Sequence, residues 1–252
     1  MEFHIQGQFG NPVILMIHGV MTPYEIMLPI TEHFTDKYRV IIPALDGHTK
    51  REPSTFISIE NEAKKIENYL KEKDISEIFC VCGFSLGGAI AHKLLSRGNI
   101  MIHNIVLDGA PLVKSPTLLT RIMTSNYLDI LRKSKARDKK TLDNFCRHFL
   151  PECYLPHYLE FIDKMSEESI INILNSVGDS TLDTNLDLIE TNLLYLHGTK
   201  MNEYLSKKSA NVIAKVYPEA TVVCFKGDTH CQCAIYEPDD WAQVVLDFIS
   251  RT

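Results

Sequence analysis

The chain has 252 residues, of which 45% are hydrophobic and 23% are charged, and its formal net charge is −6. This length and apolar content suffice for one large domain with a substantial buried core. The mild acidic charge comes without a basic stripe, which argues against nucleic acid as a partner. No apolar run approaches the roughly 20 residues that a membrane-spanning helix needs, so we also expect no membrane partner.

The beginning of the sequence and its cysteines indicate a cytoplasmic protein. Residues 1–5 lack the basic start and the apolar stretch of a secretory signal. The seven cysteines are odd in number and have no framework spacing, which fits a reducing compartment better than a disulfide scaffold. The sequence does not indicate an oligomeric state.

The predicted elements alternate between strands and helices over most of the chain. Buried-type strands are expected at residues 12–17, 40–43, 78–82, 103–107, 192–197 and 221–225. Helices are expected at residues 58–73, 86–95, 201–216 and 241–249. This order predicts an α/β fold with a mostly parallel central sheet and helices on both faces.

The alternation stops between about residues 112 and 185. That segment is helix-like, contains no convincing strand, and is broken into short helices by Pro151 and Pro156. We therefore expect a core formed by residues 1–111 and 186–252, with a helical insertion over 112–185. The basic run at 132–140 is expected to be an exposed turn between two helices of the insertion.

The most specific motif is Gly-x-Ser-x-Gly, formed by Gly83, Phe84, Ser85, Leu86 and Gly87. It lies between a predicted strand and a predicted helix, which is the context of a nucleophile elbow. In such a turn the Ser85 hydroxyl is exposed above the sheet, and a Cβ at either glycine would collide. The backbone N–H of Leu86 can stabilise an oxyanion, and Phe84 is a candidate substrate contact.

Two further segments supply partners for this serine. The first predicted strand runs into His18, Gly19 and Val20, and the Val20 N–H is a candidate second oxyanion donor. The last predicted strand is followed by a loop with His230, which is placed to act as general base on Ser85. We expect His18 itself to be structural.

On these residues the chain resembles the α/β-hydrolase fold family over most of its length. The order of nucleophile and histidine agrees, as does Asp46-Gly47-His48 after an early strand. The resemblance implies a serine hydrolase that acts on a small-molecule substrate and needs no metal or organic cofactor. It also implies that the insertion over 112–185 is a cap above the site. Its aromatics are candidates for lining an apolar cavity: Tyr127, Phe145, Phe149, Tyr154, Tyr158 and Phe161.

The chain departs from that family at the acid that orients the histidine. A typical member ends its penultimate strand with Gly-x-x-Asp, whereas Met201 occupies that position here. Glu203 lies two residues further on and can reach back. Asp108, at the end of the strand after the nucleophile helix, is the second candidate. A Ser-His pair without an acid remains the third alternative.

The pair Cys231 and Cys233 next to His230 offers soft metal ligands. Zinc sites normally use a wider pair spacing together with a second pair of ligands. We therefore expect no metal, and we expect the two cysteines to pack beneath the histidine loop.

Three functions are compatible with these residues. The leading one is hydrolysis of an ester, thioester or amide of a small apolar substrate, through an acyl-enzyme on Ser85 with His230 as base. A carbon–carbon bond hydrolase or lyase on the same fold is an alternative. A non-catalytic ligand receptor is another, motivated by Met201 and opposed by the presence of both Ser85 and His230.

Overall fold

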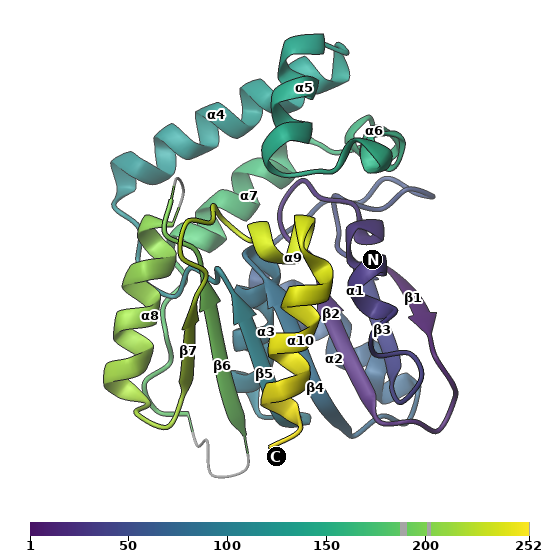
Figure 1. Ribbon diagram of the computed structural model, residues 1–252. Coiled ribbons are helices and arrows are strands. Elements are labelled where there is room, and N and C mark those ends of the chain that lie inside the picture. Colours follow the sequence, from purple (N-terminus) through teal and green to yellow (C-terminus); the bar gives the residue numbers. More distant parts are fainter. Residues whose placement is uncertain (187–190, 201–202, 252) are drawn as a thin grey trace.

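In the computed structural model, residues 1–186, 191–200 and 203–251 are described, and they contain one seven-stranded sheet in the order β1-β3-β2-β4-β5-β6-β7 (Figure 1). Strand β1 is antiparallel to β3, and all other neighbouring strands are parallel. The predicted α/β class with a mostly parallel sheet is confirmed. The strands are β1 (Glu2–Gln6), β2 (Val13–Ile17), β3 (Arg39–Ala44), β4 (Glu77–Phe84), β5 (Met101–Asp108), β6 (Asn192–His197) and β7 (Thr221–Cys224).

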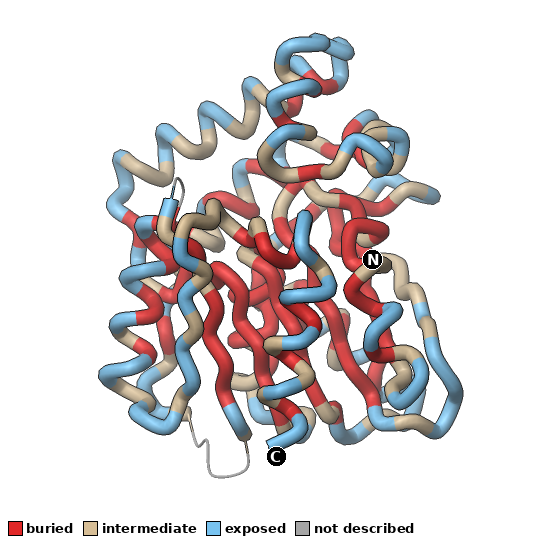
Figure 2. The backbone as a smooth tube through the Cα atoms, in the orientation of Figure 1, coloured by how far each residue is buried: buried red, intermediate tan, exposed pale blue. Residues whose placement is uncertain are grey.

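Helices cover both faces of this sheet. They are α1 (Leu28–Thr31), α2 (Ile59–Glu72), α3 (Leu86–Arg97), α4 (Thr117–Lys135), α5 (Lys139–His148), α6 (Leu155–Ile162), α7 (Glu167–Gly178), α8 (Tyr204–Val216), α9 (Gln232–Tyr236) and α10 (Pro238–Ile249), with 3-10 turns η1 (Tyr24–Met27) and η2 (Glu152–Tyr154). Helix α10 crosses one face while α2 and α3 lie on the other (Figure 1). Strand β2 is buried throughout, and β4 and β5 are buried along their carboxyl-terminal halves, as parallel strands covered on both faces are expected to be (Figure 2).

Helix α2, whose apolar residues have a regular helical spacing, begins and ends within one residue of the predicted range 58–73. The Ser58 side chain caps α2 by accepting a hydrogen bond from the Asn61 N–H at 3.1 Å. Gly98 ends α3 with a φ of 62°, a left-handed conformation that suits glycine. The predicted helix at 241–249 starts earlier, at Pro238, because proline is well tolerated in a first helical turn. Pro151 precedes η2 and Pro156 likewise lies in the first turn of α6, so both prolines mark the starts of short helical segments, as expected.

Sequence analysis missed the antiparallel edge strand β1. Its residues are mostly half-buried, so it lacks the continuous apolar run that marks the central strands. Its place is set by pairing with β3, in a register that puts Phe3 opposite Pro43.

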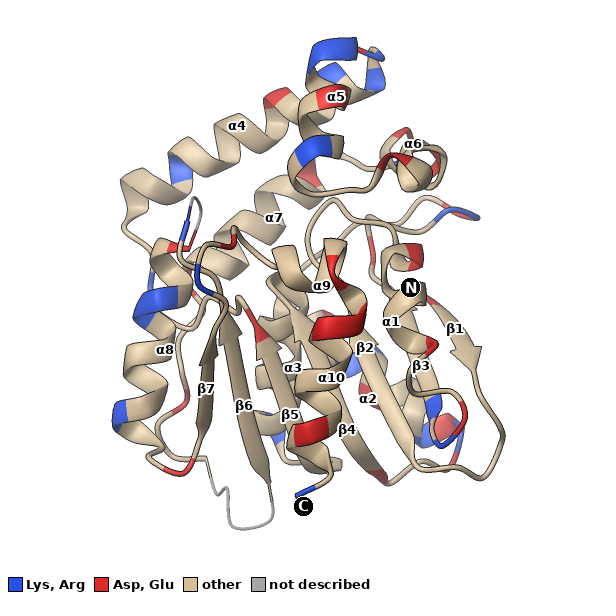
Figure 3. Ribbon diagram, in the orientation of Figure 1, with Lys and Arg blue, Asp and Glu red and all other residues tan. Residues whose placement is uncertain are grey.

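The described residues between β5 and β6 form helices α4–α7 and contain no strand. Helices α4, α5 and α6 lie above the edge of the sheet at which the parallel strands end (Figure 1). Lysine and arginine residues cluster along the chain where α4 turns into α5 (Figure 3), and this exposed turn includes Arg137 with a φ of 60°. Residues 136–138 form an exposed turn, whereas 132–135 end α4 and 139–140 begin α5, so the predicted basic turn is confirmed only in its central residues. Within the described residues, we find no helix with the length and apolar character needed to cross a bilayer.

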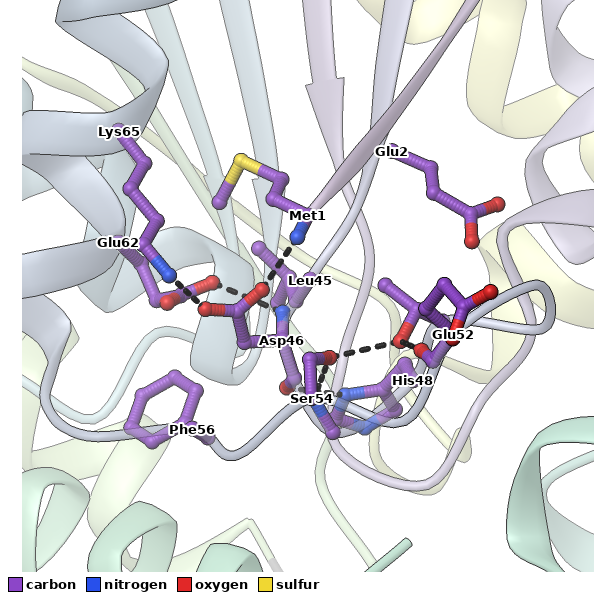
Figure 4. A network of polar contacts seen from close by, with 12 residues as sticks. Met1, Glu2, Leu45, Asp46, His48, Glu52, Ser54, Phe56, Glu62 and Lys65 are labelled. Atoms are coloured by element: carbon purple, nitrogen blue, oxygen red, sulfur yellow. Dashed lines mark hydrogen bonds and ion pairs between the residues drawn. The ribbon is translucent and has the colours of Figure 1, made fainter. Parts of the chain in front are cut away.

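Charged groups anchor the loop after β3 to α2 (Figure 4). The Asp46 carboxylate pairs with the amino-terminal ammonium of Met1 and with Lys65. The Asp46 N–H donates to Glu62 Oε2 at 3.0 Å. Burial and the charge of Asp46 raise the pKa of the Glu62 carboxyl to about 7. These contacts fix the backbone that carries His48 toward the loop after β2.

Candidate active site

Ser85 occupies a strained turn between β4 and α3. Its φ is 52° and its ψ is −111°, a backbone conformation that non-glycine residues rarely adopt. The turn is tight: a Cβ on Gly83 would lie 2.4 Å from the Gly87 carbonyl oxygen. A Cβ on Gly87 would lie 2.0 Å from the carbonyl oxygen of Ile17, at the end of β2. The first clash falls across the bend, as predicted, whereas the second involves the neighbouring strand.

Two buried histidines hold the loop after β2. The His18 Nδ1–H donates to the Gly19 carbonyl at 2.8 Å, and its Nε2 accepts the Leu45 N–H at 3.1 Å. The His48 Nε2 accepts the Met21 N–H at 2.9 Å. Burial lowers the pKa of His18 to about 4 and also lowers the pKa of His48, so both rings are neutral near pH 7. His18 thus makes the kind of structural contacts expected of it.

The two predicted oxyanion donors border the same cavity as Ser85. Leu86 is the first residue of α3, so its N–H has no acceptor within the helix. Among the described residues, no hydrogen-bond acceptor contacts the Val20 N–H.

His230 forms a charge-assisted pair with a buried carboxylate. Its Nδ1–H donates to Glu203 Oε1 at 2.8 Å, and the Glu203 side chain is 1% exposed. Burial raises the pKa of the Glu203 carboxyl, but the hydrogen bond and charge of His230 outweigh it, and the net pKa lies below its ordinary value. An ionised partner at Nδ1 leaves the Nε2 lone pair of His230 available. His230 and Ser85 line one cavity, and the described chain shows no hydrogen bond between them.

Packing between the loops after β6 and β7 brings Glu203 to this position. The Thr199 and Lys200 N–H groups both donate to the Asp228 carbonyl, at 2.9 and 2.8 Å. A Cβ on Gly198 would lie 2.5 Å from the same carbonyl oxygen, so only glycine allows the loops to approach this closely. Glu203 directly precedes α8 and lies three residues after Lys200 in the sequence.

Asp108, the other candidate acid, has a different partner. Its Oδ2 accepts the Trp241 Nε1–H at 2.9 Å, and burial raises the pKa of the carboxyl to about 7. The structure therefore places Glu203 rather than Asp108 on His230 Nδ1. Met201, which motivated the search for a replacement acid, lies outside the described residues.

The cavity above Ser85 has a volume of about 500 Å³. Phe84, Phe145 and Phe149 all lie on its wall, as does Tyr127. The other predicted aromatics are not among its lining residues: Tyr154, Tyr158 and Phe161. Tyr158 instead packs inside the helical segment, where its hydroxyl donates to Ser134 Oγ at 2.9 Å.

Sequence analysis missed part of this wall. Helix α4 contributes Leu119, Met123 and Ile130 together with Tyr127, at spacings of four, four and three residues. That spacing is a helical face and could have identified these residues as a set. Ile26 and Met27 of η1 also line the cavity, but no sequence pattern links them to the serine.

The two cysteines beside His230 face different surroundings. The Cys231 Sγ donates to the Asp108 carbonyl at 3.6 Å, and Cys231 lines the cavity. The Cys233 Sγ lies within 4.8 Å of carboxylate oxygens of Asp228 and Glu237. The two thiols therefore do not share partners.

The arrangement of a serine elbow, a histidine loop after the last strand and a helical segment above them agrees with a known protein family. Residues 12–149, more than half of the chain, match the family model described as alpha/beta hydrolase fold. This chain belongs to the α/β-hydrolase fold family.

Individual proteins resemble the chain at low identity. A pimeloyl-[acyl-carrier protein] methyl ester esterase from Nitrosomonas europaea is 23% identical over 150 residues, which cover 57% of this chain and 56% of that protein. An alpha/beta hydrolase family protein from Desulfitobacterium hafniense superposes with a TM-score of 0.76 at 21% identity, over 98% of this chain and 100% of the other. An enol-lactonase from Burkholderia xenovorans gives a TM-score of 0.76 at 17% identity, over 99% and 96%. At such identities the structural likeness establishes the fold alone.

Proposed function

We propose that this protein is a serine hydrolase that cleaves a carboxylic ester of a small apolar substrate. The Ser85 Oγ attacks the ester carbonyl while His230 Nε2 removes its proton and passes it to the leaving alcohol. The N–H groups of Val20 and Leu86 hold the oxyanion. Water, activated by the same histidine, then hydrolyses the acyl-enzyme. Thioesters and amides can follow the same route.

The observation that carries the proposal is the 2.8 Å contact between His230 Nδ1 and Glu203 Oε1 beside the cavity that Ser85 borders. A carboxylate at Nδ1 fixes the tautomer with a basic Nε2 and stabilises the imidazolium that forms during attack. A ligand receptor has no need for a buried glutamate dedicated to this histidine. The contact therefore favours an enzyme, with Glu203 as the orienting acid.

The choice of an ester rests on two supports. The wall of the cavity is mostly apolar, which suits an uncharged substrate. The names of two similar proteins, a methyl ester esterase and an enol-lactonase, both denote cleavage of an ester bond. The first of these matches only 56% of its own length, so its particular substrate is not carried over to this chain.

We further propose that residues 112–185 act as a cap that sets substrate size, on a core formed by 1–111 and 186–252. Phe145 and Phe149 contact each other on the cavity wall, with ring centroids 5.7 Å apart and ring planes tilted by 41°. Removing the Phe149 ring should enlarge this part of the cavity and move the preferred acyl chain to greater length.

A fluorophosphonate probe, which reacts with activated serines, tests the proposal directly. Wild-type protein should be labelled and should hydrolyse esters in a series of increasing acyl length, and Ser85→Ala should lose both properties. Ser96→Ala is the matched control, since Ser96 belongs to the same helix α3, is not among the cavity-lining residues, and its Oγ has no hydrogen-bond partner among the described residues. Labelling that persists in Ser85→Ala would assign the nucleophile elsewhere. An unreactive wild type would favour the receptor.

A further inference from the structure

The described residues that line the cavity carry no formal charge. None of the described residues that line it is a lysine, arginine, aspartate or glutamate. A carboxylate or ammonium on the substrate would lose its hydration there without gaining a counter-charge, which is costly. The substrate that fits this wall is therefore uncharged.

The wall nevertheless carries a half-buried hydroxyl, that of Tyr127. Tyr127 projects from the middle of α4 and is half-buried, and no described residue forms a hydrogen bond with its hydroxyl. Burial raises the pKa of this phenol to about 12, and the nearby Cys231 thiol contributes to the shift. The hydroxyl thus lies on the side of the His230 loop, where neighbouring groups exclude part of its water. A tyrosine hydroxyl in such a place normally has a hydrogen-bond partner.

The two fully buried tyrosines, Tyr158 and Tyr195, follow that rule. The Tyr158 hydroxyl donates to Ser134 Oγ at 2.9 Å, and the Tyr195 hydroxyl donates to the Ala110 carbonyl at 2.6 Å. Tyr204 also lines the cavity, but it is 54% exposed and can be hydrated. Tyr127 combines a place on the cavity wall and half-burial with a hydroxyl that has no hydrogen-bond partner among the described residues, so we expect its partner to come with the ligand.

We propose that the substrate is an uncharged ester carrying a second oxygen atom, and that the Tyr127 hydroxyl donates a hydrogen bond to this oxygen. The inference rests on the proposed esterase function and adds the substrate class. A keto, ether or hydroxyl oxygen fits, because each accepts a hydrogen bond without bringing a charge. A site built around such a donor discriminates against an all-hydrocarbon analogue, which would leave the phenol unpaired.

Matched pairs of simple esters test this assignment. Methyl hexanoate is compared with methyl 4-oxohexanoate and methyl 5-oxohexanoate, and hexyl acetate with 4-oxohexyl and 5-oxohexyl acetate. These pairs place a keto oxygen on either the acyl or the alcohol side. Hydrolysis is followed by proton release, with Ser85→Ala protein as the background. Wild-type enzyme should favour at least one keto ester over its hydrocarbon counterpart by about tenfold in kcat/KM.

The Tyr127→Phe variant should bring this ratio close to one, because it removes the donor and keeps the ring. Tyr158→Phe is the matched control, since its hydroxyl is bonded to Ser134 away from the cavity, and it should retain the wild-type ratio. Equal kcat/KM for every pair in the wild type, or a preference that survives in Tyr127→Phe, would overturn the inference while leaving the esterase intact. A wild type that hydrolyses none of these esters and resists the fluorophosphonate would overturn the proposed function itself.

Discussion

The floor and the roof of the cavity are held together by different forces. The floor consists of the loops after β2, β4, β5, β6 and β7, and close backbone contacts fix it. The Ser85 N–H, for example, donates to the Asp108 carbonyl at 2.8 Å. The roof consists of α4–α7, where side-chain packing dominates, as between Phe145 and Tyr158 with ring centroids 4.8 Å apart. Exposed ion pairs such as Arg132–Glu167, at 2.7 Å, surround that packing.

This contrast separates chemistry from selectivity. Backbone contacts leave no room for adjustment, so the floor can hold reacting groups in a fixed geometry. Apolar packing tolerates changes in side-chain shape much better, so the roof can vary the size of the cavity without disturbing the floor. Substitutions in the floor should therefore cost more than substitutions in the roof, in both activity and stability.

The largest effect is expected at the floor carboxylate that contacts His230. Glu203→Gln should lower kcat/KM on ester substrates by a factor on the order of 10³ or more, because an amide no longer enforces the required tautomer. Asp108→Asn should have a much smaller effect, since an asparagine oxygen can still accept the Trp241 N–H. Steady-state kinetics of the two variants decide the matter. An equal or greater loss of kcat/KM in Asp108→Asn would assign the orienting role to Asp108.

The next largest effect should be the loss of folding stability in Gly87→Ala. The added methyl would meet the Ile17 carbonyl at 2.0 Å, so we expect a loss of about 3 kcal/mol or more in the free energy of unfolding. Gly98→Ala is the control: no atom lies within 4 Å of its added Cβ, and only its positive φ of 62° is unfavourable. Its cost should be about 1 kcal/mol. Chemical denaturation gives both values, and similar losses would contradict a rigid floor.

Stability should also depend on pH through buried carboxyls of the core. Burial raises the pKa of Asp108 and of Glu62 to about 7, whereas carboxyls in the unfolded chain ionise near pH 4. The folded state therefore binds more protons in this window, and stability should fall as pH rises from about 4 to about 7. Asp108→Asn removes one of these groups, so its stability relative to wild type should improve across the window. Unfolding titrations of both proteins at pH 5 and pH 8 measure this change. The same stability difference between Asp108→Asn and wild type at both pH values would argue against a raised pKa of Asp108.

The smallest effect is expected on the outside of the roof. Arg132→Gln removes two hydrogen bonds of 2.7 Å to Glu167, but both side chains are exposed. Exposed ion pairs contribute little and are screened by salt. The melting temperature should fall by no more than about 2 °C, and the difference should vanish at high salt. A larger, salt-independent loss would show that the roof depends on its surface charges.

Much of the fold was accessible from the sequence because its signals are local. The apolar run that became β4, the glycines around Ser85 and the spacing of α2 each depend on residues close together in the chain. Strand β1 was missed because its position depends on pairing with β3, about 40 residues away, rather than on its own pattern. The cavity-lining face of α4 carried a helical spacing, but nothing local showed that it faced Ser85.

The sequence alone determined the α/β class, the position of the serine elbow and the segment that interrupts the alternation. Only the tertiary structure decided which carboxylate meets His230. Asp108 ends a strand close to the site, yet its carboxylate accepts a hydrogen bond from Trp241, which lies 133 residues further along the chain. Glu203 reaches the ring because the loops after β6 and β7 share the Asp228 carbonyl. Such contacts join residues that are distant in sequence, and the partner of a side chain depends on packing that no local pattern encodes.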